Sequence, residues 1–272
     1  MFYFEVNTMK ITSVRKGKGA FYIVHFDNKD RVRVSEDLLV SYRLFKDREL
    51  TDDEFIEIKR KAGFDIGFQL AMNHISYQLR SEKEVRIFLK GKEVALPDVD
   101  AIIDRLKELQ VLDDDNYAKS YVRTKMRLND KGPQVIKREL IGKGISADKI
   151  EQALDLYLPE IQEELALHAA EKVIRQTHGK SHRELLDKIR QNLFQKGFSN
   201  DIIQSIMDQL DLEVDQEDEW EALTKEGTKQ MRRLNNKDQR TKVTKIKQKL
   251  FQKGFSSDMI QKFIDEEVSD GE

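Results

Sequence analysis

A seven-residue string occurs twice in this chain. It reads LFQKGFS at Leu193 to Ser199 and again, unchanged, at Leu250 to Ser256. A weaker copy, LIGKGIS, lies at Leu140 to Ser146, and a degraded one begins at Phe88 (FLKGKEVALPDVDAII). Repetition at a nearly fixed interval is typical of a stacked array, in which each structural unit contacts its neighbours. The chain is therefore predicted to consist largely of tandem repeats.

Each copy of the string combines the end of one helix with the start of the next. A left-handed residue that ends a helix is expected at the glycines, which are Gly144, Gly197 and Gly254. The apolar residue that follows can pack back on the leucine of the string, as a Schellman motif requires. The serines are natural N-caps of the next helix, at Ser146, Ser199 and Ser256.

The degraded first copy has Glu93 at the glycine position. Because a left-handed backbone disfavours residues with a side chain, we expect its turn to be shifted towards Gly91. Pro97 is then expected to open the following helix.

The four copies place their turns at positions 93, 144, 197 and 254, which leaves room for three short helices in each interval. The predicted fold is mainly α, with tandem three-helix repeats in an elongated curved array after a small N-terminal β segment. The predicted division is a β-sheet segment plus helix at 1–62, followed by repeats at 63–115, 116–160, 161–212 and 213–272.

The first sixty residues differ from the rest. Short runs rich in β-branched and aromatic residues, at Ile11 to Arg15, Ala20 to Phe26 and Arg31 to Val34, predict a three-stranded sheet. The loops KGKG (16–19) and DNKD (27–30) suit hairpins. Such a sheet is marginal alone, so we expect it to rest on a helix from Thr51 to Ala62, with Thr51 as its cap.

Composition favours a cytoplasmic protein. Of the residues, 36% are charged and 39% hydrophobic, and there is no cysteine, which excludes disulfides and thiolate metal sites. The start, MFYFEVNTMK, lacks the basic and apolar regions of a signal peptide. No stretch approaches the roughly 18 apolar residues of a membrane span, so no membrane association is expected.

Charge is unevenly distributed along the chain. Lys225 to Lys253 contains eleven Lys or Arg and only two acidic residues, whereas Glu213 to Glu221 contains six acidic residues and no base. Cations at helical spacing can follow a phosphate backbone or an acidic protein surface. The candidate partner- or DNA-binding residues are Lys119, Arg123, Lys125, Arg127, Lys137, Arg138, Arg232, Arg233, Lys242, Lys245 and Lys249.

Six of these cations form two stripes, each along one side of a predicted helix. The first stripe consists of Lys119, Arg123 and Arg127. The second consists of Lys242, Lys245 and Lys249 and continues to Lys253. For one stripe taken alone, a solvated helix face is the more common explanation. Helical phase places Lys125 among apolar residues, where it either extends its ammonium to the surface or takes part in binding.

Motifs for catalysis fail on inspection. Gly179-Lys180-Ser181 resembles the end of a phosphate-binding loop, but Ile174 stands where the first glycine belongs. His178 and His182 have i, i+4 spacing but no neighbouring carboxylate cluster, which argues against a metal site. We therefore expect no enzymatic activity, no cofactor and no metal.

Two segments carry a family resemblance. LDDDNYAKSYVRTK (112–125) followed by KGPQVIKRELIGKGI (131–145) resembles the signature of RecX proteins, the regulators of the RecA recombinase, and RSEKEVRIFL (80–89) resembles that family's first-repeat helix. The resemblance extends from Phe64 to about Val268. It implies a helical modulator that lies in the groove of the RecA filament on single-stranded DNA and restrains its ATPase and strand exchange. The fourth repeat and the β segment depart from short members of the family.

Two functions follow, both for a protein expected to be monomeric. The first is an interaction protein that binds the RecA filament and single-stranded DNA within it. The second is a nucleic-acid-binding module that acts without RecA through helix-turn-helix units. The repeated helix starts, SADK, SNDI and SSDM, have acidic first turns that would face phosphate unfavourably, which argues against the second.

Overall fold

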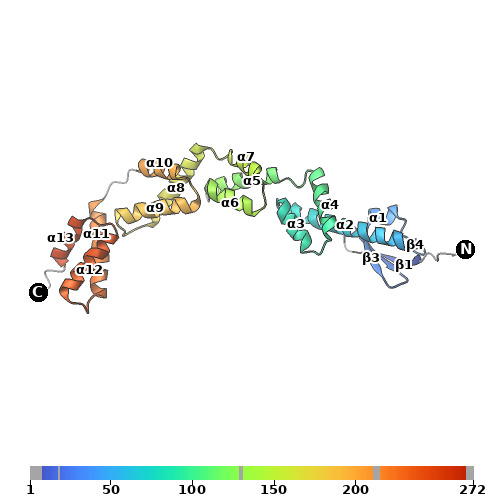
Figure 1. The fold of residues 1–272 in the computed structure, drawn as a ribbon, viewed down its shortest axis with the longest axis horizontal. Coiled ribbons are helices and arrows are strands. Elements are labelled where there is room, and N and C mark those ends of the chain that lie inside the picture. The colour runs from blue at the N-terminus through green and yellow to red at the C-terminus, as the bar shows by residue number, and fades with distance from the viewer. Residues whose placement is uncertain (1–7, 18, 129–130, 211–214, 268–272) are drawn as a thin grey trace. The chain divides into compact units, whose positions relative to one another are not determined.

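The computed structural model describes residues 8–17, 19–128, 131–210 and 215–267. Lys18 of the first expected hairpin loop, residues 129–130 of the second repeat and residues 213–214 of the acidic run lie outside this part. The elements in chain order (Figure 1) are β1 (Thr8–Lys16), β2 (Phe21–Phe26), β3 (Arg31–Ser35), α1 (Glu36–Ser41), β4 (Glu49–Thr51), α2 (Asp52–Tyr77), α3 (Glu82–Lys90), α4 (Leu96–Glu108), α5 (Asp114–Arg127), α6 (Pro133–Gly142), α7 (Ala147–Leu154), α8 (Pro159–Gln176), α9 (His182–Lys196), α10 (Asn200–Leu210), α11 (Gln216–Arg233), α12 (Gln239–Gln252) and α13 (Ser257–Glu267).

The N-terminal sheet has four antiparallel strands in the order β3-β2-β1-β4. The two predicted hairpins are confirmed, but the prediction of three strands was wrong. The fourth strand, β4, pairs Thr51 with Thr8 and Leu50 with Met9. It has only three residues, so alternation of apolar and polar positions could not reveal it. The helix α1 was also not predicted.

The sheet rests on α2, as expected. Thr51 caps this helix through a capping box with Glu54. Phe55 and Ile58 of α2 pack into the same buried cluster as Val24 of the sheet.

The predicted end of this helix at Ala62 was wrong, because α2 continues to Tyr77. Gly63 and Gly67 would each weaken an isolated helix by about 1 kcal/mol. Beyond them, however, Phe64 and Phe68 pack on the core of the first repeat, and this burial favours a continuous helix.

The predicted helix ends are confirmed at all three glycines. Gly144, Gly197 and Gly254 have φ angles of 84°, 90° and 94°. After Gly197 and Gly254, the next residues, Phe198 and Phe255, are buried. Phe198 donates its backbone N–H to the Leu193 carbonyl at 3.2 Å, and Phe255 donates to the Leu250 carbonyl at 3.3 Å. These are the bonds that define a Schellman motif.

The expectation that the first copy turns at Gly91 was wrong. Gly91 is right-handed, with φ −67°, whereas Glu93 itself is left-handed, with φ 60°. Val94 donates its N–H to the Leu89 carbonyl at 3.2 Å, which is the same bond as in the other copies. Leu89 is fully buried and Val94 packs beside it, so the packing of these residues sets the register of the turn.

Among the described residues, each proposed range from 63 onwards contains three helices, counting the second half of α2. The first repeat has a core around Val85, Leu89 and Ile102, and the last has one around Leu223, Ile246 and Phe263. The chain forms two compact units: one extends to Ala118 and includes Ile141–Lys149, and the other includes Lys119–Leu140 and continues from Ile150. The boundary between the two units therefore passes through the second repeat.

Candidate partner-binding surface

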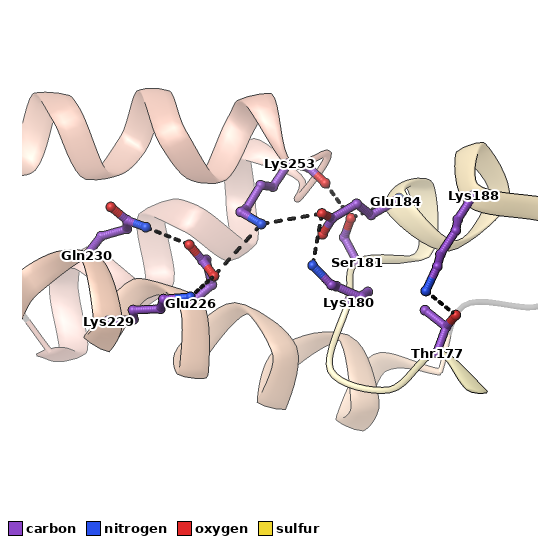
Figure 2. Close-up of polar contacts among 9 residues, drawn as sticks. All are labelled: Thr177, Lys180, Ser181, Glu184, Lys188, Glu226, Lys229, Gln230 and Lys253. Carbon is purple, nitrogen blue, oxygen red and sulfur yellow. Dashed lines mark hydrogen bonds and ion pairs between the residues drawn. The ribbon is translucent and has the colours of Figure 1, made fainter. Parts of the chain in front are cut away.

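Consecutive repeats meet where the second helix of one repeat begins. Between the third and fourth repeats, Ser181 caps α9 by accepting the Glu184 N–H at 3.1 Å, and its hydroxyl donates to the backbone carbonyl of Lys253. The Lys253 ammonium lies 3.3 Å from Glu184 Oε1 and 3.8 Å from Glu226 Oε2 (Figure 2). One lysine of the repeated string thus connects two repeats through both its backbone and its side chain.

The same joint occurs between the first and second repeats. Ser81, which is fully buried, caps α3 and donates to the Lys143 carbonyl at 2.8 Å. The Lys143 ammonium lies 2.7 Å from Glu84 Oε1. Burial alone would raise the pKa of Glu84, but hydrogen bonds from Lys143 and from the Ser81 backbone outweigh it and hold this pKa below its ordinary value.

A carboxylate from the first turn of a later helix, α5 or α11, completes each of these joints. Asp114 accepts the Glu82 N–H at 2.8 Å, and Glu219 accepts the His182 N–H at 2.7 Å. Both N–H groups belong to the first residue of a helix, where no intrahelical acceptor exists. Burial raises the pKa of both carboxyl groups, so each favours its neutral form more than an exposed carboxyl does.

The joint between the second and third repeats contains two backbone hydrogen bonds. Gly132 donates its N–H to the Lys196 carbonyl at 2.7 Å, and Gln134 donates to the Gly197 carbonyl at 3.1 Å. A Cβ on Gly132 would lie 2.7 Å from the Gly197 carbonyl oxygen, so only glycine permits this approach. The repeated string therefore supplies an acceptor at every junction.

These joint residues were not predicted. The signal that could have revealed them is the pattern Ser-x-x-Glu, at 81–84 and 181–184, which precedes the second helix of two repeats and is typical of a helix start.

The first group of predicted cations lies on α5 and α6. Arg123, Arg127, Lys137 and Arg138 are exposed, and Lys119 is partly exposed. Lys137 forms an ion pair with Glu151 at 4.0 Å. An exposed ion pair at this distance contributes little to stability.

Lys125 lies in a small polar cluster on the same surface. Its ammonium is 5.4 Å from the centre of the Tyr121 ring, within cation–π range. The Tyr121 hydroxyl donates to Glu139 at 2.7 Å, and Lys131 pairs with the other oxygen of Glu139. These two hydrogen bonds outweigh burial and hold the pKa of Glu139 below its ordinary value.

The second group of cations lies on α11 and α12. Arg232 and Arg233 occupy the last turn of α11, where the helix dipole favours positive charge, and both are exposed. On α12, Lys245 and Lys249 are exposed and Lys242 is partly exposed. Lys253 was expected to continue this stripe, but only 19% of its side chain is exposed and it belongs to the joint instead.

All eleven predicted cations lie in the second compact unit, in these two groups. In the part of the chain that the structure describes, no group of three or more His, Asp or Glu side chains is arranged to hold a metal ion. No described helix is long and apolar enough to cross a membrane.

Comparison with known families matches three kinds of domain. The first three-helix domain of RecX matches residues 68–106, the second matches 113–154, and the third matches both 160–207 and 217–264. The third and fourth repeats therefore correspond to the same family domain.

Similar proteins cover nearly the whole chain. The regulatory protein RecX of Enterococcus faecalis is 45% identical over 256 residues, which are 94% of this chain and 96% of that protein. The regulatory protein RecX of Bacillus subtilis is 38% identical over 258 residues, covering 95% and 97% of the two chains.

Two crystal structures are also similar. One, of a regulatory protein RecX, is 32% identical and matches 74% of this chain and 99% of its own, with a TM-score of 0.62. The other, of RecX from Lactobacillus salivarius, is 42% identical and matches 56% of this chain and 98% of its own, with a TM-score of 0.53.

Proposed function

Because this chain belongs to the RecX family of regulatory proteins, we propose that it regulates the RecA recombinase by binding the RecA filament on single-stranded DNA. In this proposal, binding restrains ATP hydrolysis and strand exchange by RecA. The chain acts in the cytoplasm as a monomer, without catalytic activity or a cofactor of its own.

The observation that carries this proposal is the recurring joint between repeats. A buried serine, a lysine and a glutamate connect the first repeat to the second and the third to the fourth in the same way. Repeat proteins built from such nearest-neighbour contacts present similar surfaces at regular intervals. A filament of identical protomers also presents its surfaces at regular intervals, so it is a suitable partner.

The two groups of cations supply the electrostatic part of the proposal. Exposed Lys and Arg on α5, α6, α11 and α12 can neutralise acidic side chains of the filament or phosphates of the DNA within it. We propose that Arg123, Arg127, Lys245 and Lys249, all exposed, make the principal contacts of this kind.

The alternative function is nucleic-acid binding without RecA. It would require the third helices of the repeats to enter a groove. Their first turns contain Asp148, Asp201 and Asp258, which would repel phosphates beside the groove. This arrangement favours the filament over free duplex DNA as the partner.

The test is ATP hydrolysis by the RecA of the same organism on single-stranded DNA. Adding this chain at substoichiometric to equimolar ratios should lower the rate, while the chain alone should hydrolyse no ATP. Images of the filaments with bound chain should show added density along them. Unchanged RecA turnover, together with no detectable binding to the filament, would rule out the proposal.

A further inference from the structure

The two identical copies of LFQKGFS can be divided by what each residue does in the fold. The leucines, Leu193 and Leu250, are fully buried, and the second phenylalanines, Phe198 and Phe255, are 3% exposed. The lysines supply the carbonyls at the joints, the glycines are left-handed, and the serines accept the N–H of the third residue of the next helix. Each of these positions is therefore explained by folding.

The first phenylalanine of the string is not explained by folding. The side chain of Phe194 is 65% exposed and that of Phe251 is 60% exposed. Ile141, at the same position in the second repeat, is 56% exposed. Single exposed apolar side chains are common on any protein. Here, however, a large apolar side chain is exposed at the same position of three repeats, and this recurrence indicates a shared role.

A cation lies one helical turn before each of these apolar residues. Lys137 precedes Ile141, Arg190 precedes Phe194, and Lys247 precedes Phe251, always by four positions. Residues four apart lie on the same face of a helix. Each repeat from the second onwards thus presents an apolar side chain with a positive charge beside it.

Phe251 lies in open surroundings that a partner surface can reach. A shallow groove of about 340 Å³ lies beside it, between α12 and α13, and is lined by Lys247, Ser257, Ile260 and Gln261. Lys247 donates to Gln261 across this groove at 2.6 Å and lines the groove together with Phe251.

We propose that Phe194 and Phe251 are equivalent docking residues for successive protomers of one filamentous protein, each entering an apolar pocket with a carboxylate at its rim. This inference rests on the proposed function, which identifies the filament as RecA. Two identical contacts one repeat apart need a partner that offers the same pocket at least twice, as a polymer does. The positive charge beside each ring selects the acidic rim.

Exposed aromatic rings can also stack on the bases of single-stranded DNA. The second repeat argues against that use here, because Ile141 stands at the equivalent position and an aliphatic side chain offers no stacking face. An apolar pocket, in contrast, accepts either an aromatic or a branched aliphatic side chain.

The test measures the affinity of the full chain for RecA filaments assembled on single-stranded DNA, and for the DNA alone. Phe194→Gln and Phe251→Gln should each weaken filament binding about tenfold or more, as residues at the centre of an interface do. The melting temperature should not fall, since both side chains are exposed. As a matched control, Ile56→Gln with Ile87→Gln removes apolar side chains that are 64% and 60% exposed, and should leave filament binding unchanged.

A conservative pair separates the two uses of the ring. The double variant Phe194→Leu with Phe251→Leu should keep most of the filament affinity if the partner offers an apolar pocket. Loss of affinity for DNA alone in the glutamine variants, or equal loss in the leucine variants, would assign the rings to base stacking and overturn the inference.

Two further outcomes distinguish this inference from the proposed function. If the parent chain binds RecA filaments and the double glutamine variant binds them equally well, the docking residues are wrong while the proposed function stands. If the parent chain does not bind the filaments, the proposed function and this inference both fail.

Discussion

At the scale of single residues, one backbone conformation ends the second helix of every repeat. Its φ angle is 60° at Glu93 and between 84° and 94° at the three glycines. This left-handed conformation costs a residue with a side chain about 1–2 kcal/mol. Glu93 adopts it because the buried Leu89 and the packed Val94 fix the turn on either side.

This strain predicts that Glu93→Gly stabilises the first repeat, by about 0.5–1 kcal/mol after allowing for the greater freedom of glycine in the unfolded chain. Thermal unfolding followed by circular dichroism would measure the change. Glu93→Ala is the matched control, since it removes the same carboxylate without relieving the backbone. Equal effects of the two variants would show that the backbone at this position is not strained.

At the scale of elements, the repeats are joined by a small set of polar contacts around the start of one helix. Glu184 contacts two lysines, and these differ in their surroundings. Lys253 comes from the next repeat and its side chain is 19% exposed, whereas Lys180 lies on the same segment, 3.1 Å from Glu184, and is 42% exposed. Figure 2 shows both ammonium groups converging on this carboxylate.

The difference in burial predicts different costs for two otherwise equal substitutions. Lys253→Gln should lower the free energy of unfolding by on the order of 1–2 kcal/mol, because it removes the least exposed of the cations that pair with Glu184 and Glu226, two partly buried carboxylates. Lys180→Gln should lower it by only about 0.3–0.5 kcal/mol, as exposed i, i+4 pairs do. Chemical denaturation of both variants would check this, and equal costs would mean that Lys253 does not stabilise the joint.

The joint between the first two repeats should depend on pH. The pKa of Glu84 is lowered in the folded state, so its ionised form stabilises the fold above the ordinary carboxyl pKa of 4.5. That contribution is lost as the pH falls through the lower, folded-state pKa. The stability of the first compact unit should therefore fall more steeply with acidification in the parent chain than in Glu84→Gln, which cannot titrate there. Parallel pH profiles would contradict the assignment.

At the scale of the whole molecule, the candidate binding cations are grouped in two of the repeats. The long run from Lys225 to Lys253 and the stripe on α5 lie in repeats that are not adjacent in the chain. Charges placed this way do not contribute to packing, since most of these side chains are exposed. Their effect is expected in binding.

Replacing a whole stripe by glutamine should test that role. The triple variants at Lys119, Arg123 and Arg127 and at Lys242, Lys245 and Lys249 should keep their helices, because glutamine is a comparable helix former. Binding to the RecA filament should weaken. If phosphates are contacted, each lost contact should reduce the slope of log affinity against log salt by about 0.7.

Affinities for the filament and for single-stranded DNA, measured at several salt concentrations, would provide these slopes. Both triple variants binding like the parent chain, with unchanged slopes, would identify the stripes as solvated helix faces.

The features that could be predicted from the sequence are those that depend on neighbours in the chain. The left-handed glycines, the serine caps, the three helices in each repeat and the two hairpins follow from short patterns, because capping and turn geometry are satisfied within a few residues. The family resemblance was confirmed on the same local motifs.

The remaining features were decided only by tertiary structure. The strand β4 forms because its backbone pairs with the edge of β1. The helix α2 continues past two glycines because Phe64 and Phe68 pack against the core of the first repeat. Lys253 does not belong to the exposed stripe that was predicted, because its ammonium contacts Glu184, 69 positions earlier in the sequence. In each case the deciding interaction either joins residues that are distant in sequence or buries a side chain against another element. A short sequence pattern does not indicate which surfaces will come into contact.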